Sequence, residues 1–233
     1  MYEEKIIPPK KAMPQAQDGT LRKFALRVPE VIYQCSGIMV FGKRIKSLVF
    51  STDLSIIKNV NADAIIAVYP FTPQPIITQA LLLAADIPVF AGVGGGLTKG
   101  QRVVNLAMFA EMQGATGVVL NAPTANTGVQ HVAETIDIPV VVTVARADTD
   151  FEARLQAGAN IFNVSAAAET PAIVRSIRER YPDVPIIATG GPTDESILET
   201  IQAGANAITW TPPSNGEIFR DIMAAYRDNK PHP

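Results

Sequence analysis

The chain has very few of the side chains on which redox, thiol and metal chemistry depend. Its 233 residues include one cysteine, Cys35, and two histidines, His131 and His232. A single cysteine cannot form an internal disulfide, and two histidines are too few for a histidine-based metal site. We therefore expect Cys35 to be a buried thiol in a reducing cytoplasm, and we predict no metal.

Long hydrophobic runs and an excess of one charge are also missing. No apolar stretch reaches the roughly 18 residues of a membrane span, and the first five residues do not resemble a secretion signal. The net charge is −2, and there is no run of basic residues. We expect neither a membrane nor nucleic acid as partner. The 47% of apolar residues indicates a globular protein.

A repeated segment is the strongest signal in the sequence. Residues 156–160, Gln-Ala-Gly-Ala-Asn, recur letter for letter at 202–206, and Asp-Ile-Pro-Val at 86–89 returns at 137–140. A repeat at regular spacing is typical of one supersecondary unit that is used several times.

Short β-branched runs alternate with helical patterns from residue 47 onward. The predicted strands are 47–50, 64–69, 89–93, 117–120, 140–144, 161–164, 186–189 and 207–210. Helical patterns between them include 98–113, 170–181 and 193–203. This alternation predicts an α/β fold, a (β/α)8 or TIM barrel, with an open doubly wound sheet as the alternative.

The repeat also divides the chain. Residues 47–227 form the predicted barrel, and 228–233 a tail. Residues 1–46 lie outside the repeat as an extension with a proline-rich arm, a helix over 21–34 that is interrupted near Pro29, and a short strand over 37–41. We expect the extension to close the N-terminal end of the barrel or to contact a second subunit, which makes a homo-oligomer possible.

Aligning the repeats separates the two faces of the strands. Every second residue of a strand points to the same face. One of the two sets is wholly apolar, includes Trp210, and is expected to pack under the helices. The other set faces the barrel axis and becomes polar toward the carboxyl ends of the strands. It predicts a ring of neutral groups at the barrel mouth, either structural or ligand-binding, that comprises Asn121, Asn163, Ser165, Thr189, Thr209 and Thr211.

Two glycine-containing loops and one helix start suggest anion binding. Gly190 and Gly191 follow the seventh strand, and Ser214 begins a helix after the eighth, where this fold usually holds phosphate. Gly94 and Gly95 follow the third strand, in a loop that could cradle an anion or a carbonyl group, or act as a lid.

The stretch Ile186–Ala207, "IIATGGPTDESILETIQAGANA", resembles the phosphate-binding (β/α)8 barrels. That superfamily includes thiamin-phosphate synthase, aminosugar-phosphate epimerases and many FMN oxidoreductases. The resemblance implies a phosphate site at the loops after the seventh and eighth strands. The eighth loop differs from the family pattern because Pro212 and Pro213 donate no N–H, so the alternative is two rigid turns that bind nothing.

Few ionisable side chains follow the strands. No lysine occupies an inward position, which argues against a Schiff-base aldolase, and no Gly-x-Ser-x-Gly motif is present. Asp53 is the candidate general base, although it could instead cap the helix that follows. Arg146 is the candidate clamp for a carboxylate or a phosphate.

These features favour an enzyme that acts on a small anionic, phosphorylated metabolite by isomerase- or lyase-type proton transfer at the barrel mouth. An FMN-binding oxidoreductase, a hydrolase and a non-catalytic metabolite-binding barrel are the alternatives. Apart from the possible FMN, we predict no cofactor.

Overall fold

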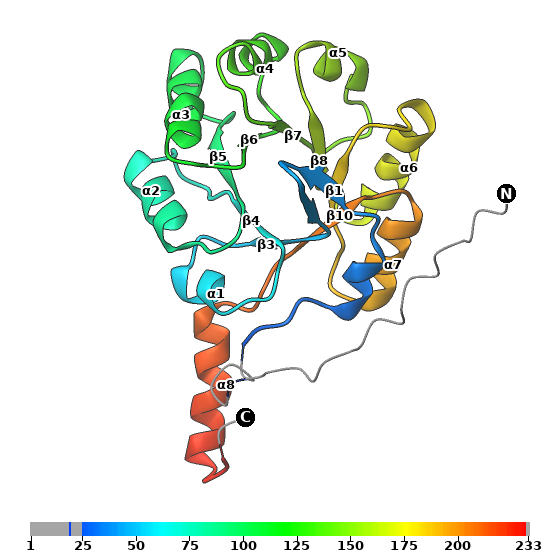
Figure 1. The fold of residues 1–233 in the computed structure, drawn as a ribbon. Helices are drawn as coiled ribbons and strands as arrows, with labels where there is room; N and C mark the ends of the chain where they lie inside the picture. The colour runs from blue at the N-terminus through cyan, green and yellow to red at the C-terminus, as the bar shows by residue number, and fades with distance from the viewer. Residues whose placement is uncertain (1–18, 20–24, 232–233) are drawn as a thin grey trace, which may run out of the picture.

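The computed structural model describes Gly19 and residues 25–231. Within them, eight parallel strands close into a barrel in the order β10-β3-β4-β5-β6-β7-β8-β9 (Figure 1). The barrel strands are β3 (Ser47–Phe50), β4 (Ala64–Ala67), β5 (Val89–Gly94), β6 (Gly117–Leu120), β7 (Val140–Val144), β8 (Ile161–Val164), β9 (Ile186–Thr189) and β10 (Ala207–Trp210). The predicted TIM barrel is confirmed, and the open sheet is excluded because β10 pairs with β3.

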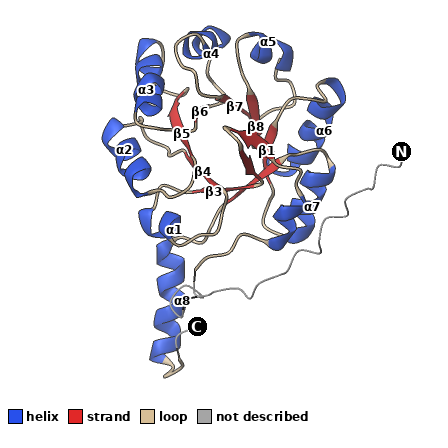
Figure 2. Ribbon diagram, in the orientation of Figure 1, coloured by secondary structure: helices blue, strands red, loops and turns tan. Residues whose placement is uncertain are grey.

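Helices form a ring outside the strands (Figure 2). They are α1 (Leu54–Lys58), α2 (Pro75–Ala84), α3 (Gln101–Met112), α4 (Asn126–Ala133), α5 (Phe151–Gln156), α6 (Thr170–Arg180), α7 (Asp194–Gln202) and α8 (Asn215–Arg227). None of the helices in the described part of the chain is long and apolar enough to cross a membrane. α8 differs from the others because it projects away from the barrel and buries none of its residues (Figure 1).

The alternation along the strands separates two apolar clusters, as the sequence predicted. Leu48, Ile66 and Val119 belong to a cluster inside the barrel. Their outward neighbours, such as Val49, belong to the larger cluster under the helices, against which Trp210 also packs. Because side chains alternate along a strand, the residue that comes directly after an outward residue at the carboxyl end of a strand faces the barrel mouth.

The repeated asparagines join neighbouring strands at the bottom of the barrel. Asn160, just before β8, accepts a hydrogen bond from Val140 N at 2.8 Å through Oδ1. Asn206, just before β10, accepts one from Ile186 N at 2.9 Å in the same way. Asp63 does this for Ser47 N at 3.0 Å. Each side chain satisfies a backbone donor at or next to the start of the preceding strand.

The extension contributes a hairpin to the barrel floor. β1 (Ile38–Val40) pairs with β2 (Lys43–Ile45), and three of their side chains join the interior cluster: Ile38, Val40 and Ile45. Gly37 N donates to Asn206 O at 2.9 Å, which ties the hairpin to the N-terminal end of β10.

The predicted helix over 21–34 is wrong for residues 25–29. Leu26 forms a bridge with Val60, and only Glu30–Gln34 is helical, as the short 3-10 helix η2 beside α7. Pro29 disfavours helical geometry in the residue before it, and Val28 N donates instead to Asn61 Oδ1 at 2.7 Å. The arm predicted before residue 19 and residues 21–24 lie outside the described part.

Asn206 should be a major stabilising residue, because its side chain also accepts from Arg178 Nη2 at 2.7 Å and donates to Ser36 Oγ at 2.9 Å. We expect Asn206→Ala to lower the free energy of unfolding by about 2 kcal/mol, since it leaves a part-buried N–H without a partner. Urea denaturation measures this. Asn105→Ala, on the exposed side of α3, is the control and should change it by less than about 0.5 kcal/mol. Equal effects of the two substitutions would contradict this role.

Cys35 is buried, and burial raises the pKa of its thiol to about 12. The native protein should therefore react with a disulfide reagent at pH 8 far more slowly than the protein in urea, because the thiolate is the nucleophile. Absorbance at the reagent's wavelength follows the reaction. Equal rates with and without urea would show that the segment around Cys35 opens readily.

Candidate active site

The main cavity lies at the carboxyl ends of the strands and has a volume of about 590 Å³. The loops after β3, β4, β6 and β10 line it with Phe50, Ser51, Thr52, Asp53, Ile56, Val68, Tyr69, Pro70, Asn121, Thr211, Pro212, Pro213, Ser214 and Asn215. Asp53 is the one ionisable carboxylate in this lining, and no lysine, arginine or histidine is among these residues.

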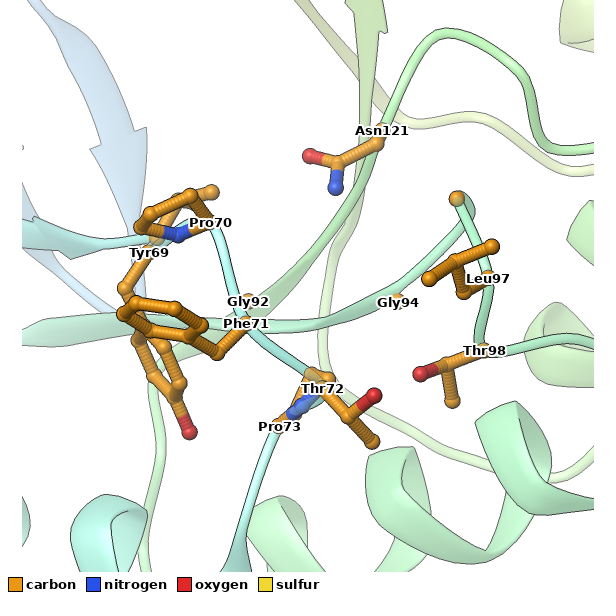
Figure 3. A pocket seen from close by; sticks show the side chains of 12 residues that line it. Tyr69, Pro70, Phe71, Thr72, Pro73, Gly92, Gly94, Leu97, Thr98 and Asn121 are labelled. Atoms are coloured by element: carbon orange, nitrogen blue, oxygen red, sulfur yellow. The ribbon is translucent and has the colours of Figure 1, made fainter.

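A smaller pocket of about 120 Å³ adjoins the main cavity and is shown in Figure 3. We call it the glycine-loop pocket. It is lined by Val68, Tyr69, Pro70, Phe71, Thr72, Pro73, Gly92, Gly94, Gly96, Leu97, Thr98 and Asn121. Val68, Tyr69, Pro70 and Asn121 are shared with the main cavity, so the two spaces form one site.

Asp53 connects the first and last loops of the barrel. Its Oδ1 caps α1 by accepting from Ser55 N at 2.8 Å and Ser55 Oγ at 2.7 Å. Its Oδ2 accepts from Asn215 Nδ2, at the start of α8, at 2.5 Å. The Ser55 hydroxyl above all, with the backbone N–H groups and Asn215, lowers the pKa of Asp53. These contacts support the capping role. A lowered pKa makes the carboxylate a weak base that stays ionised, so the general-base role stays a prediction.

Arg146 points to solvent. Its guanidinium holds Asp148 in a two-pronged ion pair, with Nε–Oδ1 at 2.8 Å and Nη2–Oδ2 at 2.6 Å. The Arg146 side chain is 78% exposed and lines neither the main cavity nor the glycine-loop pocket. The clamp that the sequence suggested would require this pair to separate and the side chain to turn inward.

The loop after β9 uses its glycines for packing. A Cβ on Gly190 would lie 2.7 Å from Ile197 Cγ1 and 2.9 Å from Ile208 Cγ2, so only glycine lets α7 approach β10 here. Gly191 has a φ of 78°, which favours glycine. α7 begins with a capping box of Thr193 and Ser196, and two exposed carboxylates, Asp194 and Glu195, occupy its first turn.

The loop after β10 ends in a second capping box. Ser214 Oγ accepts from Glu217 N at 3.3 Å, and Glu217 Oε2 accepts from Ser214 N at 2.8 Å. Glu217 therefore places a negative charge at the start of α8. With Pro212 and Pro213 also lacking an N–H, few donors remain for a phosphate at this end.

The predicted polar ring is divided by the structure. Asn121 and Thr211 line the main cavity, whereas Ser165 is exposed elsewhere on the rim. Asn163 and Thr189 lie beneath the mouth. Asn163 Nδ2 donates to Thr143 Oγ1 at 3.4 Å, and Thr189 Oγ1 lies 3.4 Å from Thr170 Oγ1. Two buried atoms in the barrel interior, Asn163 Oδ1 and Thr209 Oγ1, have no hydrogen-bond partner among the described residues.

The glycine loop after β5 folds back on itself. Gly94 and Gly95 have positive φ angles of 138° and 112°. Gly95 N donates to Thr98 O at 3.1 Å, and Asn121 N donates to Gly94 O at 2.9 Å. A Cβ on Gly95 would lie 2.1 Å from Thr124 Oγ1. The Gly95 N–H is thus already used, while Gly94 lines the pocket with backbone atoms.

The loop after β4 forms one wall of the site. The Tyr69 hydroxyl in this loop accepts a hydrogen bond from Gln74 N at 2.8 Å, which fixes the loop. The three prolines within 70–75 were the available signal in the sequence, because they stiffen a segment directly after a strand.

The described residues contain no group of three or more His, Cys, Asp or Glu side chains that could hold a metal ion.

The chain matches no protein-family model and no curated protein sequence. Its fold is similar to that of 2,3-dimethylmalate lyase, a PEP mutase/isocitrate lyase superfamily member, with a TM-score of 0.60, 11% identity, and coverage of 90% of this chain and 84% of that chain. The fold of phosphoenolpyruvate phosphomutase from Streptomyces platensis subsp. rosaceus is similar with a TM-score of 0.58 and 15% identity, and the match covers 79% of this chain and 83% of that chain. For a dihydrodipicolinate synthase from Bacillus anthracis the TM-score is 0.54 and the identity 16%, and the match covers 78% of this chain and 76% of that chain. At such low identities these similarities show the shared barrel fold alone.

Asp53 should stabilise the protein through its charge as well as its hydrogen bonds. We expect Asp53→Asn to lower the free energy of unfolding at pH 7 by about 0.5 kcal/mol, because a neutral amide oxygen accepts weaker hydrogen bonds than a carboxylate does. Because the folded-state pKa of Asp53 is lowered, this stabilisation is complete above its ordinary pKa of about 4 and is lost as the pH falls through the lower value.

Urea unfolding of the wild type and Asp53→Asn at pH 7 and at about pH 3 tests this, and the difference should shrink at acid pH. Asp137→Asn is the matched control, since the Asp137 carboxylate makes no hydrogen bond within the described residues. A difference that stays constant with pH would assign the effect to shape and not to charge.

Proposed function

We propose that the protein is an enzyme of the isomerase or lyase type that acts on a small anionic metabolite at the barrel mouth. One observation supports this most strongly. A cavity of about 590 Å³ opens at the carboxyl ends of the strands, and its lining combines apolar walls with a few neutral hydrogen-bonding side chains and one carboxylate. Pockets of 300 to 1,000 Å³ with such linings are typical of sites for small metabolites, and TIM-barrel enzymes place their active sites at this end.

The residues divide into binding and proton-transfer roles. Asn121, after β6, and Thr211, after β10, both line the main cavity and would hydrogen-bond substrate oxygens. Asp53 Oδ2 accepts one hydrogen bond, from Asn215, so a carboxylate lone pair is left for a substrate proton. As an ionised weak base it suits an acidic C–H, such as one next to a carbonyl group. The lyase and the phosphomutase with similar folds bear names of small anionic substrates, which favours this class.

The structure favours a carboxylate over a phosphate as the anionic group. Asp194, Glu195 and Glu217 already place negative charge at the starts of α7 and α8. A doubly charged phosphate there would be repelled by them. The FMN hypothesis needs the same phosphate site and meets the same obstacle.

Ligand screening by thermal unfolding tests the substrate class. We expect one or more of pyruvate, oxalate and malate to stabilise the protein, by about 2.7 kcal/mol at a hundredfold excess over the dissociation constant. Inorganic phosphate and FMN should give no shift. A shift with FMN and a yellow protein would replace the proposal with the oxidoreductase hypothesis.

Catalysis is tested by hydrogen exchange. Nuclear magnetic resonance in heavy water should show deuterium entering the C–H of a bound carboxylate next to its carbonyl or hydroxyl carbon. Asp53→Asn should abolish the exchange while the ligand still binds. Binding without any exchange or turnover in the wild type would make the protein a non-catalytic metabolite-binding barrel.

A further inference from the structure

The glycine-loop pocket contains polar side chains that have no hydrogen-bond partner among the described residues. Thr98 is 6% exposed, and its hydroxyl makes no hydrogen bond within the described residues. The Asn121 amide and the Thr72 hydroxyl likewise make none there. Figure 3 shows the Asn121 amide and the oxygens of Thr72 and Thr98 directed toward the same space. Thr98 is buried, Asn121 is half-buried and Thr72 is exposed. A buried hydroxyl usually has a partner, so the unpaired Thr98 indicates that a ligand supplies one, and the other two side chains are free to contact the same ligand.

The pocket is small compared with typical ligand sites. Its volume is about 120 Å³, well below the 300 Å³ or more of typical ligand sites. It opens into the main cavity through the residues that the two share, among them Asn121. It therefore suits one functional group of a ligand whose remainder lies in the main cavity.

The charges of the mouth indicate the sign of that group. Residues 64–110 contain one acidic residue, Asp86, which pairs with Lys58 near the N-terminal end of β5. Lys99 directly follows Thr98, is exposed, and has no ion pair within the described part of the chain. On the other side of the mouth stand Asp53 and the carboxylates at the starts of α7 and α8. The glycine-loop side is the one where an anion meets no negative charge.

We infer that the glycine-loop pocket binds the carboxylate of the substrate, with Asn121 Nδ2 and the hydroxyls of Thr72 and Thr98 as donors. This inference rests on the proposed function and assigns an orientation within it. The carboxylate lies under the glycine loop, and the rest of the substrate extends across the mouth toward Asp53. Neutral donors suit a singly charged carboxylate, because they satisfy its oxygens without a buried counter-charge.

The pocket walls match this orientation. Phe71 and Leu97, from the loops after β4 and β5, are 74% and 97% exposed at the pocket rim. Apolar side chains here would reduce the access of water to a bound carboxylate and strengthen its hydrogen bonds.

The test compares the dissociation constants of pyruvate, oxalate and malate, and of the neutral amide of each, by isothermal titration calorimetry. Thr98→Val keeps the shape of the side chain and removes its hydroxyl. The carboxylate that binds the wild type should bind this variant roughly tenfold to hundredfold more weakly. Asn121→Asp, which adds a negative charge, should weaken it further. Thr200→Val is the matched control, since it removes an equally buried hydroxyl, bonded within α7, and should leave the constant unchanged.

The outcomes separate this inference from the proposed function. Carboxylate binding that is equal in the wild type, Thr98→Val and Asn121→Asp would overturn the inference and leave the proposed function intact. If the amides bind as tightly as the carboxylates and lose affinity in Thr98→Val, the pocket binds the ligand, but the inference that it selects a carboxylate is overturned. If none of the carboxylates binds the wild type, the anionic substrate itself is overturned, and the inference with it.

Discussion

The barrel depends on how its parallel strands begin. The first backbone donors of a strand lie at the floor, where an unpaired N–H has little access to water, so each needs a partner. Asp63, Asn160 and Asn206 supply one from the residue just before the following strand. Because a shift by one residue would turn every inward side chain outward, this contact also holds the register that directs Asn121 and Thr211 to the mouth.

The same contact explains why the sequence repeats where it does. Residues 156–160 and 202–206 run from the end of a helix to the asparagine before a strand, at the floor of the barrel. The same hydrogen bond between neighbouring strands is needed at several places on the floor, so the same residues recur there. The loops at the mouth have no such contact in common, and their sequences differ. The repeat is therefore strong evidence for the fold and says little about the reaction.

The sequence was sufficient for the parts of the structure that local periodicity determines. Strand positions, the outward direction of Trp210 and the cap at Asp53 follow from alternation and capping rules. It was not sufficient where distant segments decide. Thr98 looked like the start of a helix, but the turn at Gly94 and Gly95, packed against the loop after β6, buries it in a pocket wall. Arg146 looked available for a substrate until its pair with Asp148 was seen.

The starts of α7 and α8 are stabilised by side chains of the chain itself. In phosphate-binding barrels the free N–H groups and the dipole at the last helices attract an anion. Here Thr193 and Ser214 cap those donors, and acidic side chains occupy the first turns. Both effects that would bind a phosphate are already satisfied within the chain. Unpaired donors that line a pocket lie across the mouth at Thr98 and Asn121, where acidic side chains are absent from the lining. An anionic substrate would bind where hydrogen-bonding capacity remains, which is the reason for placing the proposed carboxylate beneath the glycine loop.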